Sequence, residues 1–155
     1  MPLFFSSQGF ASGLAGTLTL TLAPGGPAGA GLPSGRGQYR LVPIDGTIHT
    51  IYFSIRTGVP LVSTGFTATV FVAPPSPTYP FGGPLATEPG FVASPVTVAI
   101  SGPLAGGTYS VNMSDVGSVA VLAGGAVALQ IEKDDAGDGS NTLTTFSACV
   151  ILTPS

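Results

Sequence analysis

The chain has 155 residues, a formal net charge of −3 and only 7% charged residues, beside 44% hydrophobic residues. Ordinary soluble domains carry about 25% charged residues, so this chain has too few to cover the surface of a monomer in the usual way. Nucleic-acid binding needs clustered basic side chains, and it is excluded because the four basic residues are scattered at positions 36, 40, 56 and 133. The composition indicates one domain with a neutral, hydroxyl-rich surface that is partly hidden against other copies.

The chain begins with an apolar stretch, MPLFF, and no charged side chain precedes Arg36. The stretch lacks the basic residues that open a secretory signal. Gly, Pro, Ser and Thr interrupt the uncharged region throughout, so it has no apolar run of the roughly 18 residues that indicate a transmembrane helix. Neither a secretion signal nor a membrane anchor is therefore expected.

Two interpretations of this N-terminal segment remain open. Pro2-Leu3-Phe4-Phe5 is either an edge strand of the chain's own sheet or a segment that docks in another copy and builds a fibre. The docking interpretation is favoured, because the polar Ser6-Ser7-Gln8-Gly9 stretch sets the tip apart and Pro2 favours an extended chain. It predicts an extended apolar connector at 1–13 and a single domain at 14–155.

Apolar and polar side chains alternate through the rest of the chain, a pattern typical of β-strands with one buried side. In 48–57, Ile51, Phe53 and Ile55 share one side, and the intervening residues share the other. No stretch has a convincing helical period, so an all-β sandwich or barrel with little or no helix is expected. The predicted strands are 17–22, 48–57, 66–72, 95–100, 108–113, 118–122, 126–132 and 142–153.

The connections between these strands contain residues that favour turns. Gly124-Gly125 separates two strands, and glycine readily adopts the positive φ that tight turns need. The connection at 73–90 is longer than most and rich in proline, which excludes a central strand. Tyr79, Phe81 and the nearby Phe91 make it a candidate surface-binding loop with aromatic side chains for stacking.

Residues with catalytic or metal-binding chemistry are few. His49, the single histidine, lies in a predicted strand on the side of Ile51, where a half-buried, hydrogen-bonded ring is expected. Cys149, the single cysteine, excludes an intrachain disulfide and is expected to be a buried, inert thiol. An acidic stretch at 132–141 lacks the spacing of an EF-hand and is interpreted as a solvated hairpin tip. Its candidate oxygen ligands are Asp134, Asp135, Asp138 and Asn141. No catalytic residue, cofactor or metal is predicted.

Several segments together resemble a known family. They are GFASG (9–13), IDGTIHTIYFSIRTG (44–58), FTATVFVA (66–73) and the closing strand TFSACVIL. They are similar to the C-terminal domains of the collagen-like glycoproteins on the exosporium of Bacillus-type endospores, particularly the B-type branch. The similarity covers most of the chain, and it is best in the strand that contains DGTI and in the two strands around it.

The resemblance implies a jelly roll of the tumour-necrosis-factor and complement-C1q kind that assembles as a compact trimer. It also implies a structural place on the spore surface, with no catalysis and no secretion signal. Members of the family usually carry a long Gly-X-Y collagen stalk before this domain, whereas MPLFFSSQGFASG stands in its place here.

Two functions are expected from these observations. The favoured one is a non-catalytic structural protein that forms homotrimers and stacks them head to tail into fibres through Pro2-Leu3-Phe4-Phe5, with other spore-surface proteins as further partners. The alternative is a trimeric carbohydrate- or receptor-binding head that uses the loop with Tyr79, Phe81 and Phe91. A hydrolase is disfavoured, because no pair of acids outside the 132–141 stretch is available.

Overall fold

The computed structural model describes residues 1–11, 18–21, 26–28, 39–57, 60, 65–75, 91–107, 109–133 and 142–155. In these ranges the chain is built from strands and their connections, and it has no helix long and apolar enough to cross a membrane. The strands are β1 (Pro2–Ala11), β2 (Leu18–Thr21), β3 (Gly26–Ala28), β4 (Tyr39–Leu41), β5 (Gly46–Thr57), β6 (Gly65–Ala73), β7 (Val92–Ser101), β8 (Tyr109–Ser114), β9 (Val119–Val121), β10 (Ala126–Lys133) and β11 (Thr142–Pro154).

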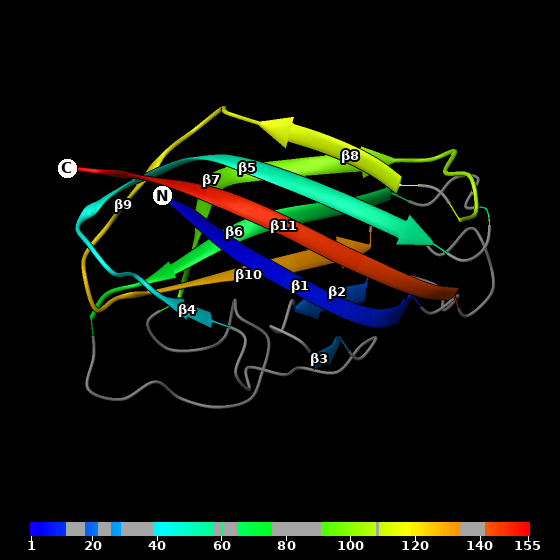
Figure 1. The fold of residues 1–155 in the computed structure, drawn as a ribbon, viewed down its shortest axis with the longest axis horizontal. Helices are drawn as coiled ribbons and strands as arrows, with labels where there is room; N and C mark the ends of the chain where they lie inside the picture. The colour runs from blue at the N-terminus through cyan, green and yellow to red at the C-terminus, as the bar shows by residue number, and fades with distance from the viewer. Residues whose placement is uncertain are drawn as a thin grey trace.

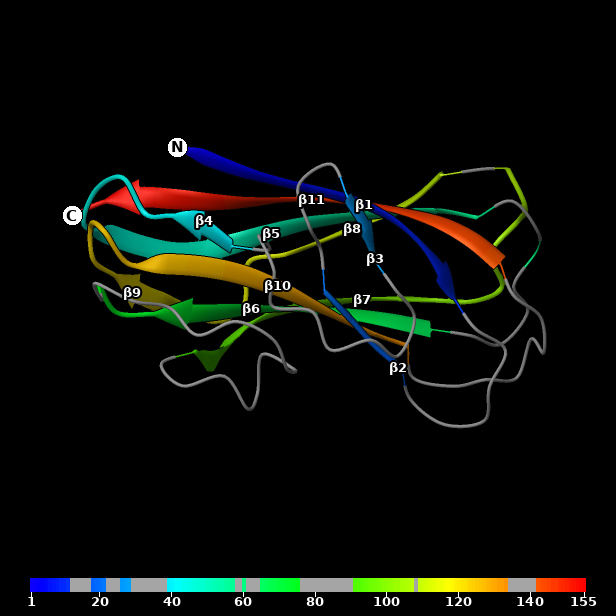
Figure 2. The ribbon, with the colours of Figure 1, turned by 90° about the horizontal axis from the view of Figure 1, so that it is seen from below.

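The strands form two sheets that stack face to face (Figures 1 and 2). Sheet A has the order β3-β1-β11-β5-β8, with β9 also paired to β5, and sheet B has the order β2-β10-β6-β7, with β4 also paired to β10. The chain crosses repeatedly between the sheets, because β5, β8 and β11 belong to sheet A whereas β6, β7 and β10 belong to sheet B. This arrangement is a jelly-roll β-sandwich, which confirms the predicted all-β jelly roll.

The core lies between the two sheets and contains a cluster of aromatic rings. The rings of Phe53 and Phe146, both in sheet A, stack with their centroids 6.2 Å apart. Phe66 of sheet B meets Phe146 edge to face at 5.6 Å. All three side chains are fully buried, so this contact joins the two sheets, and such aromatic pairs contribute beyond the area they bury.

The predicted alternation is confirmed along β5. Ile51, Phe53 and Ile55 are at most 1% exposed, whereas Tyr52 and Arg56 are exposed. The alternation fails at one place, since Thr50 pairs with Ile151 and Ile48 pairs with Leu152, which leaves His49 in a bulge. The prediction that His49 shares the side of Ile51 is therefore wrong, because a bulge inserts one residue and shifts the period.

The N-terminal segment lies in the domain's own sheet. β1 pairs antiparallel with β11 over its whole length, from Pro2 opposite Ile151 to Ala11 opposite Thr142. The amino group of Met1 donates to the carbonyl oxygen of Leu152 at 2.7 Å, and Phe5 is 2% exposed in the core. The predicted connector at 1–13, separate from a domain at 14–155, is wrong for the described residues 1–11. The pairing partner lies at the far end of the sequence, where no local pattern reveals it.

The turn between β9 and β10 depends on glycine, as the sequence indicates. Gly124 has a φ of +83°, which favours glycine strongly. A Cβ on Gly125 would lie 2.7 Å from the carbonyl oxygen of Ala73. The turn is also held by Asp45, whose carboxylate accepts the amide of Ala123 at 2.8 Å.

Candidate functional site

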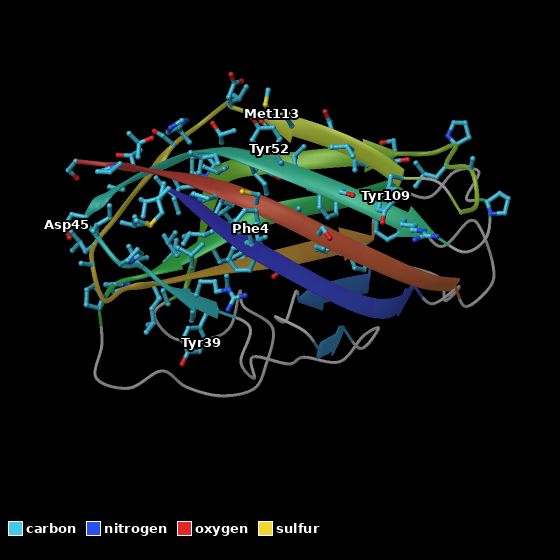
Figure 3. The ribbon with its side chains drawn as sticks, viewed as in Figure 1. Phe4, Tyr39, Asp45, Tyr52, Tyr109 and Met113 are labelled. Carbon is cyan, nitrogen blue, oxygen red and sulfur yellow. The ribbon has the colours of Figure 1, made fainter. Side chains whose placement is uncertain are left out.

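A row of apolar side chains crosses the outer face of sheet A, which is the side turned away from sheet B. The strand registers place Phe4 of β1 beside Cys149 of β11, Cys149 beside Tyr52 of β5, and Tyr52 beside Met113 of β8. Phe4 is 63% exposed, Tyr52 43% and Met113 47%. Figure 3 looks onto this face and shows Phe4, Tyr52 and Met113 along it. Four strands that are distant in sequence thus build one exposed apolar row.

The neighbouring rows of the outer face carry small and aromatic side chains. Ser147, Ser54 and Val111 lie side by side in the next row, and Val111 is 66% exposed. In the row beyond it, the guanidinium of Arg56 lies 5.4 Å from the ring centre of Tyr109, within the range of a cation–π contact. The outer face of sheet A is therefore apolar in its middle, and it carries the positive charge of Arg56 beside the first residue of β8.

A groove of about 340 Å³ runs over this face. Arg40 borders it, and its Nε donates to the carbonyl oxygen of Phe4 at 3.1 Å while its guanidinium lies 6.0 Å from the ring centre of Phe5. Arg40 belongs to β4 of sheet B, so this contact ties the N-terminal strand to the other sheet. The groove is lined by Phe4, Phe5, Arg40, Tyr52, Phe53, Ser54, Val111, Ser147, Ala148 and Cys149.

Cys149 lies in the middle of the row and is half-buried. Desolvation by burial raises the pKa of its thiol, and the N-terminal ammonium opposes this effect. The raised pKa leaves less of the reactive thiolate at a given pH. The predicted burial of this thiol is wrong, since Cys149 is only half-buried.

The outer face of sheet B differs from that of sheet A. Its apolar cluster is covered by the chain itself, since Phe71 is 4% exposed, Phe91 is 7% exposed and Tyr39 packs against them. Phe91 is thus not available for stacking on a ligand, and this part of the predicted surface-binding loop is wrong. Tyr79 and Phe81 lie outside the described residues.

The remaining candidates for chemistry have structural roles or lie outside the described ranges. The Nε2 atom of His49 is 2.7 Å from the hydroxyl of Thr153, and its Nδ1 atom is 2.8 Å from the hydroxyl of Thr50. The expected half-buried, hydrogen-bonded histidine is confirmed. Within the described ranges, no three His, Cys, Asp or Glu side chains gather as a metal site. The candidate oxygen ligands Asp134, Asp135, Asp138 and Asn141 lie outside these ranges.

The sequence predicted the alternation of side chains in β8, but it did not show which side of the strand faces away from the core. Tyr109, Val111 and Met113 alternate as predicted, but they point outward and are 66%, 66% and 47% exposed. An alternating strand normally turns its apolar side to the core. The available signal was Tyr52, an aromatic residue on the side of β5 opposite Phe53.

Comparisons with known proteins address the fold. No protein-family profile and no curated protein matches the chain. A chain of infectious bursal disease virus, Gt strain, superposes with a TM-score of 0.51 at 13% identity, over 98% of this chain and 33% of that one. The Eiger TNF from S. frugiperda superposes with a TM-score of 0.38 at 13% identity, over 98% of this chain and 94% of that one.

The chain therefore spans about a third of the length of the virus chain that it matches. At this level of identity the likeness shows the fold alone. It agrees with the strand order of the two sheets, which defines a jelly-roll β-sandwich.

Proposed function

We propose that this protein is a non-catalytic structural protein of the spore surface that self-assembles as a homotrimer through the outer face of sheet A. The observation that carries the proposal is the exposed row of Phe4, Tyr52 and Met113. Contiguous exposed apolar patches mark interaction sites in soluble proteins. The threefold stoichiometry and the spore surface rest on the resemblance to the exosporium glycoprotein domains.

The number of large exposed side chains on the outer face of sheet A suits a stable interface. Burying one large apolar side chain contributes roughly 1.5–3 kcal/mol, whereas association costs about 4–15 kcal/mol in lost translational and rotational freedom. Several anchors are therefore needed in one patch. The large exposed side chains on this face are Phe4, Tyr52, Tyr109, Val111 and Met113.

The N-terminal segment contributes to this assembly from within its own sheet. Phe5 points into the core and holds β1 in place, while the adjacent Phe4 points outward with 63% of its surface exposed. Leu3 packs against the core, and Pro2 is exposed at the start of the strand. One segment thus supplies both a core residue and a residue of the proposed interface.

Sedimentation equilibrium of the full chain at micromolar concentration tests the proposal. The expected mass is three times that of the 15.3 kDa chain. The trimer should persist in about 1 M salt, because screening weakens charge pairs and leaves apolar burial intact. A stable monomer at micromolar concentration would reject the proposal.

A second candidate function, a carbohydrate- or receptor-binding head, is favoured by the groove on the same face. It combines the aromatic rings of Phe4 and Tyr52 with the hydroxyls of Ser54 and Ser147 and the guanidinium of Arg40. Aromatic walls with a few polar groups are common in ligand sites. A glycan array in which Tyr52→Ser removes a clean hit would support this second function.

A further inference from the structure

The end strands of the two sheets lie on the same side of the sandwich. β8 ends sheet A and β7 ends sheet B, and both lie along the upper side of Figure 1. An end strand presents unpaired N–H and C=O groups to which a strand of another molecule can add. A protein with so few charges lacks the charged edge residues that often prevent such pairing.

Asn112 of β8 lies at this edge on the side of the strand that is turned toward sheet B, and it is exposed there. The registers place it in the same row as Phe53, Ala148 and Phe5, all of which are buried. Its Nδ2 donates to the carbonyl oxygen of Ala99 in β7 at 2.7 Å. Its Oδ1 accepts the amide of Met113 at 2.9 Å. The side chain of Asn112 thus binds the backbone oxygen of Ala99 at the edge of sheet B and the backbone amide of Met113 at the edge of sheet A.

β7 carries two further features that hinder strand addition. Pro95 has no amide hydrogen to donate. The register shifts from Thr69 opposite Thr97 to Phe71 opposite Ala93, which marks an irregularity between them. The amide of Val96 in this stretch donates to the hydroxyl of Ser94 at 3.1 Å. Bulges and prolines are known means of protecting an edge.

We propose that Asn112 closes the β7–β8 edge against strand addition by a second copy of this chain. By occupying the oxygen of Ala99 and the amide of Met113, it leaves the outer face of sheet A as the surface for ordered association. This role of Asn112 does not depend on the proposed trimer. Each variant is compared with the wild-type protein at equal concentration, whatever the size of the wild-type species.

The test uses the full chain with Asn112→Ala, Asn112→Asp and Ser110→Ala. Ser110 is a matched control, since it lies two residues earlier on β8 and pairs with Ile55, on the same inward side. Light scattering against concentration reports association, and hydrogen exchange reports the amide of Met113. We expect N112A to raise that exchange rate by roughly three- to tenfold and to form species larger than the wild type. S110A should do neither.

The N112D variant distinguishes association through an opened strand edge from association caused by a loss of stability. The Asp side chain still accepts the amide of Met113 but loses the bond to Ala99, and its charge discourages edge pairing. N112D should therefore keep the size of the wild type. The proposal is overturned if N112A associates no more than S110A, or if N112A and N112D associate alike.

Discussion

Aromatic side chains on the outer faces of the two sheets differ in their exposure to solvent. On sheet B, Phe71 and Phe91 are 4% and 7% exposed, because the chain covers them itself. On sheet A, Phe4 and Tyr52 are 63% and 43% exposed. The aromatic side chains are thus covered on the outer face of sheet B and uncovered on that of sheet A, although Leu41 of sheet B is 61% exposed. Under the proposed function, the uncovered aromatic rings of sheet A are the surface that another copy covers.

The largest effect should come from the covered face. Phe71→Ala removes a buried ring from the cluster with Ala126 and Ala128, and such truncations cost about 3–5 kcal/mol. Urea unfolding should show this loss, while sedimentation of the folded fraction still shows the wild-type mass. A loss below about 1 kcal/mol would mean that this cluster does not support the fold.

On the uncovered face, the double variant Phe4→Ser, Tyr52→Ser should affect association instead. Each truncated anchor should weaken the interface by roughly 2 kcal/mol, which together is about a thousandfold in Kd. Unfolding of the single chain should change little, since both rings are exposed. Sedimentation at several concentrations measures the effect.

A control pair for that double variant exists on sheet B. Thr67→Ser and Thr97→Ser also place two serines on an outer face, and Thr97 is exposed there. The control should sediment as the wild type does. If both pairs of substitutions dissociate the protein equally, the outer face of sheet A has no special role.

A smaller effect is expected for Arg56→Gln. Arg56 is exposed and lies over the ring of Tyr109 at 5.4 Å, and exposed cation–π contacts contribute about 0.5–1 kcal/mol. Association measured by sedimentation should weaken by no more than this amount. A loss of all association in R56Q would show that charge, rather than apolar burial, holds the copies together.

The smallest effect should come from the hydroxyl-bearing part of sheet B. The hydroxyls of Thr69 and Thr97 lie 3.2 Å apart in a solvent-exposed pair. Thr69→Val keeps the branched side chain that suits a strand, so thermal unfolding should change by about 0.5 kcal/mol or less. A change above about 1 kcal/mol would contradict the solvent-exposed position of this hydroxyl pair.

The sequence predicted the strands whose pattern is local. The alternation from Ile51 to Ile55 and the turn at Gly124 required only neighbouring residues, and both are confirmed. β4 was not predicted, since its three residues, Tyr39–Leu41, are too few to show a period.

The N-terminal strand could not be recognised for a different reason. Leu3, Phe4 and Phe5 do not alternate with polar residues, and their partner strand β11 lies at the other end of the chain. The outward orientation of Met113 could not be predicted either. Alternation shows that the two sides of a strand differ, but it does not show which side faces the core. A surface that associates with copies of itself follows the same apolar pattern as a core.

Cys149 allows the most direct test of the claim that the outer face of sheet A is the interface. It is the single cysteine, and it lies between Phe4 and Tyr52. Because burial raises the pKa of its thiol, less thiolate is present at a given pH, and its labelling profile should be displaced to higher pH than that of a free cysteine.

The decisive measurement is the rate at which a bulky thiol reagent labels Cys149 at fixed pH, followed across the concentration range of association. We predict that the rate falls as wild-type protein associates and stays constant in the Phe4→Ser, Tyr52→Ser variant. A wild-type rate that stays constant while sedimentation shows association would contradict the account, because the copies would then meet through another surface.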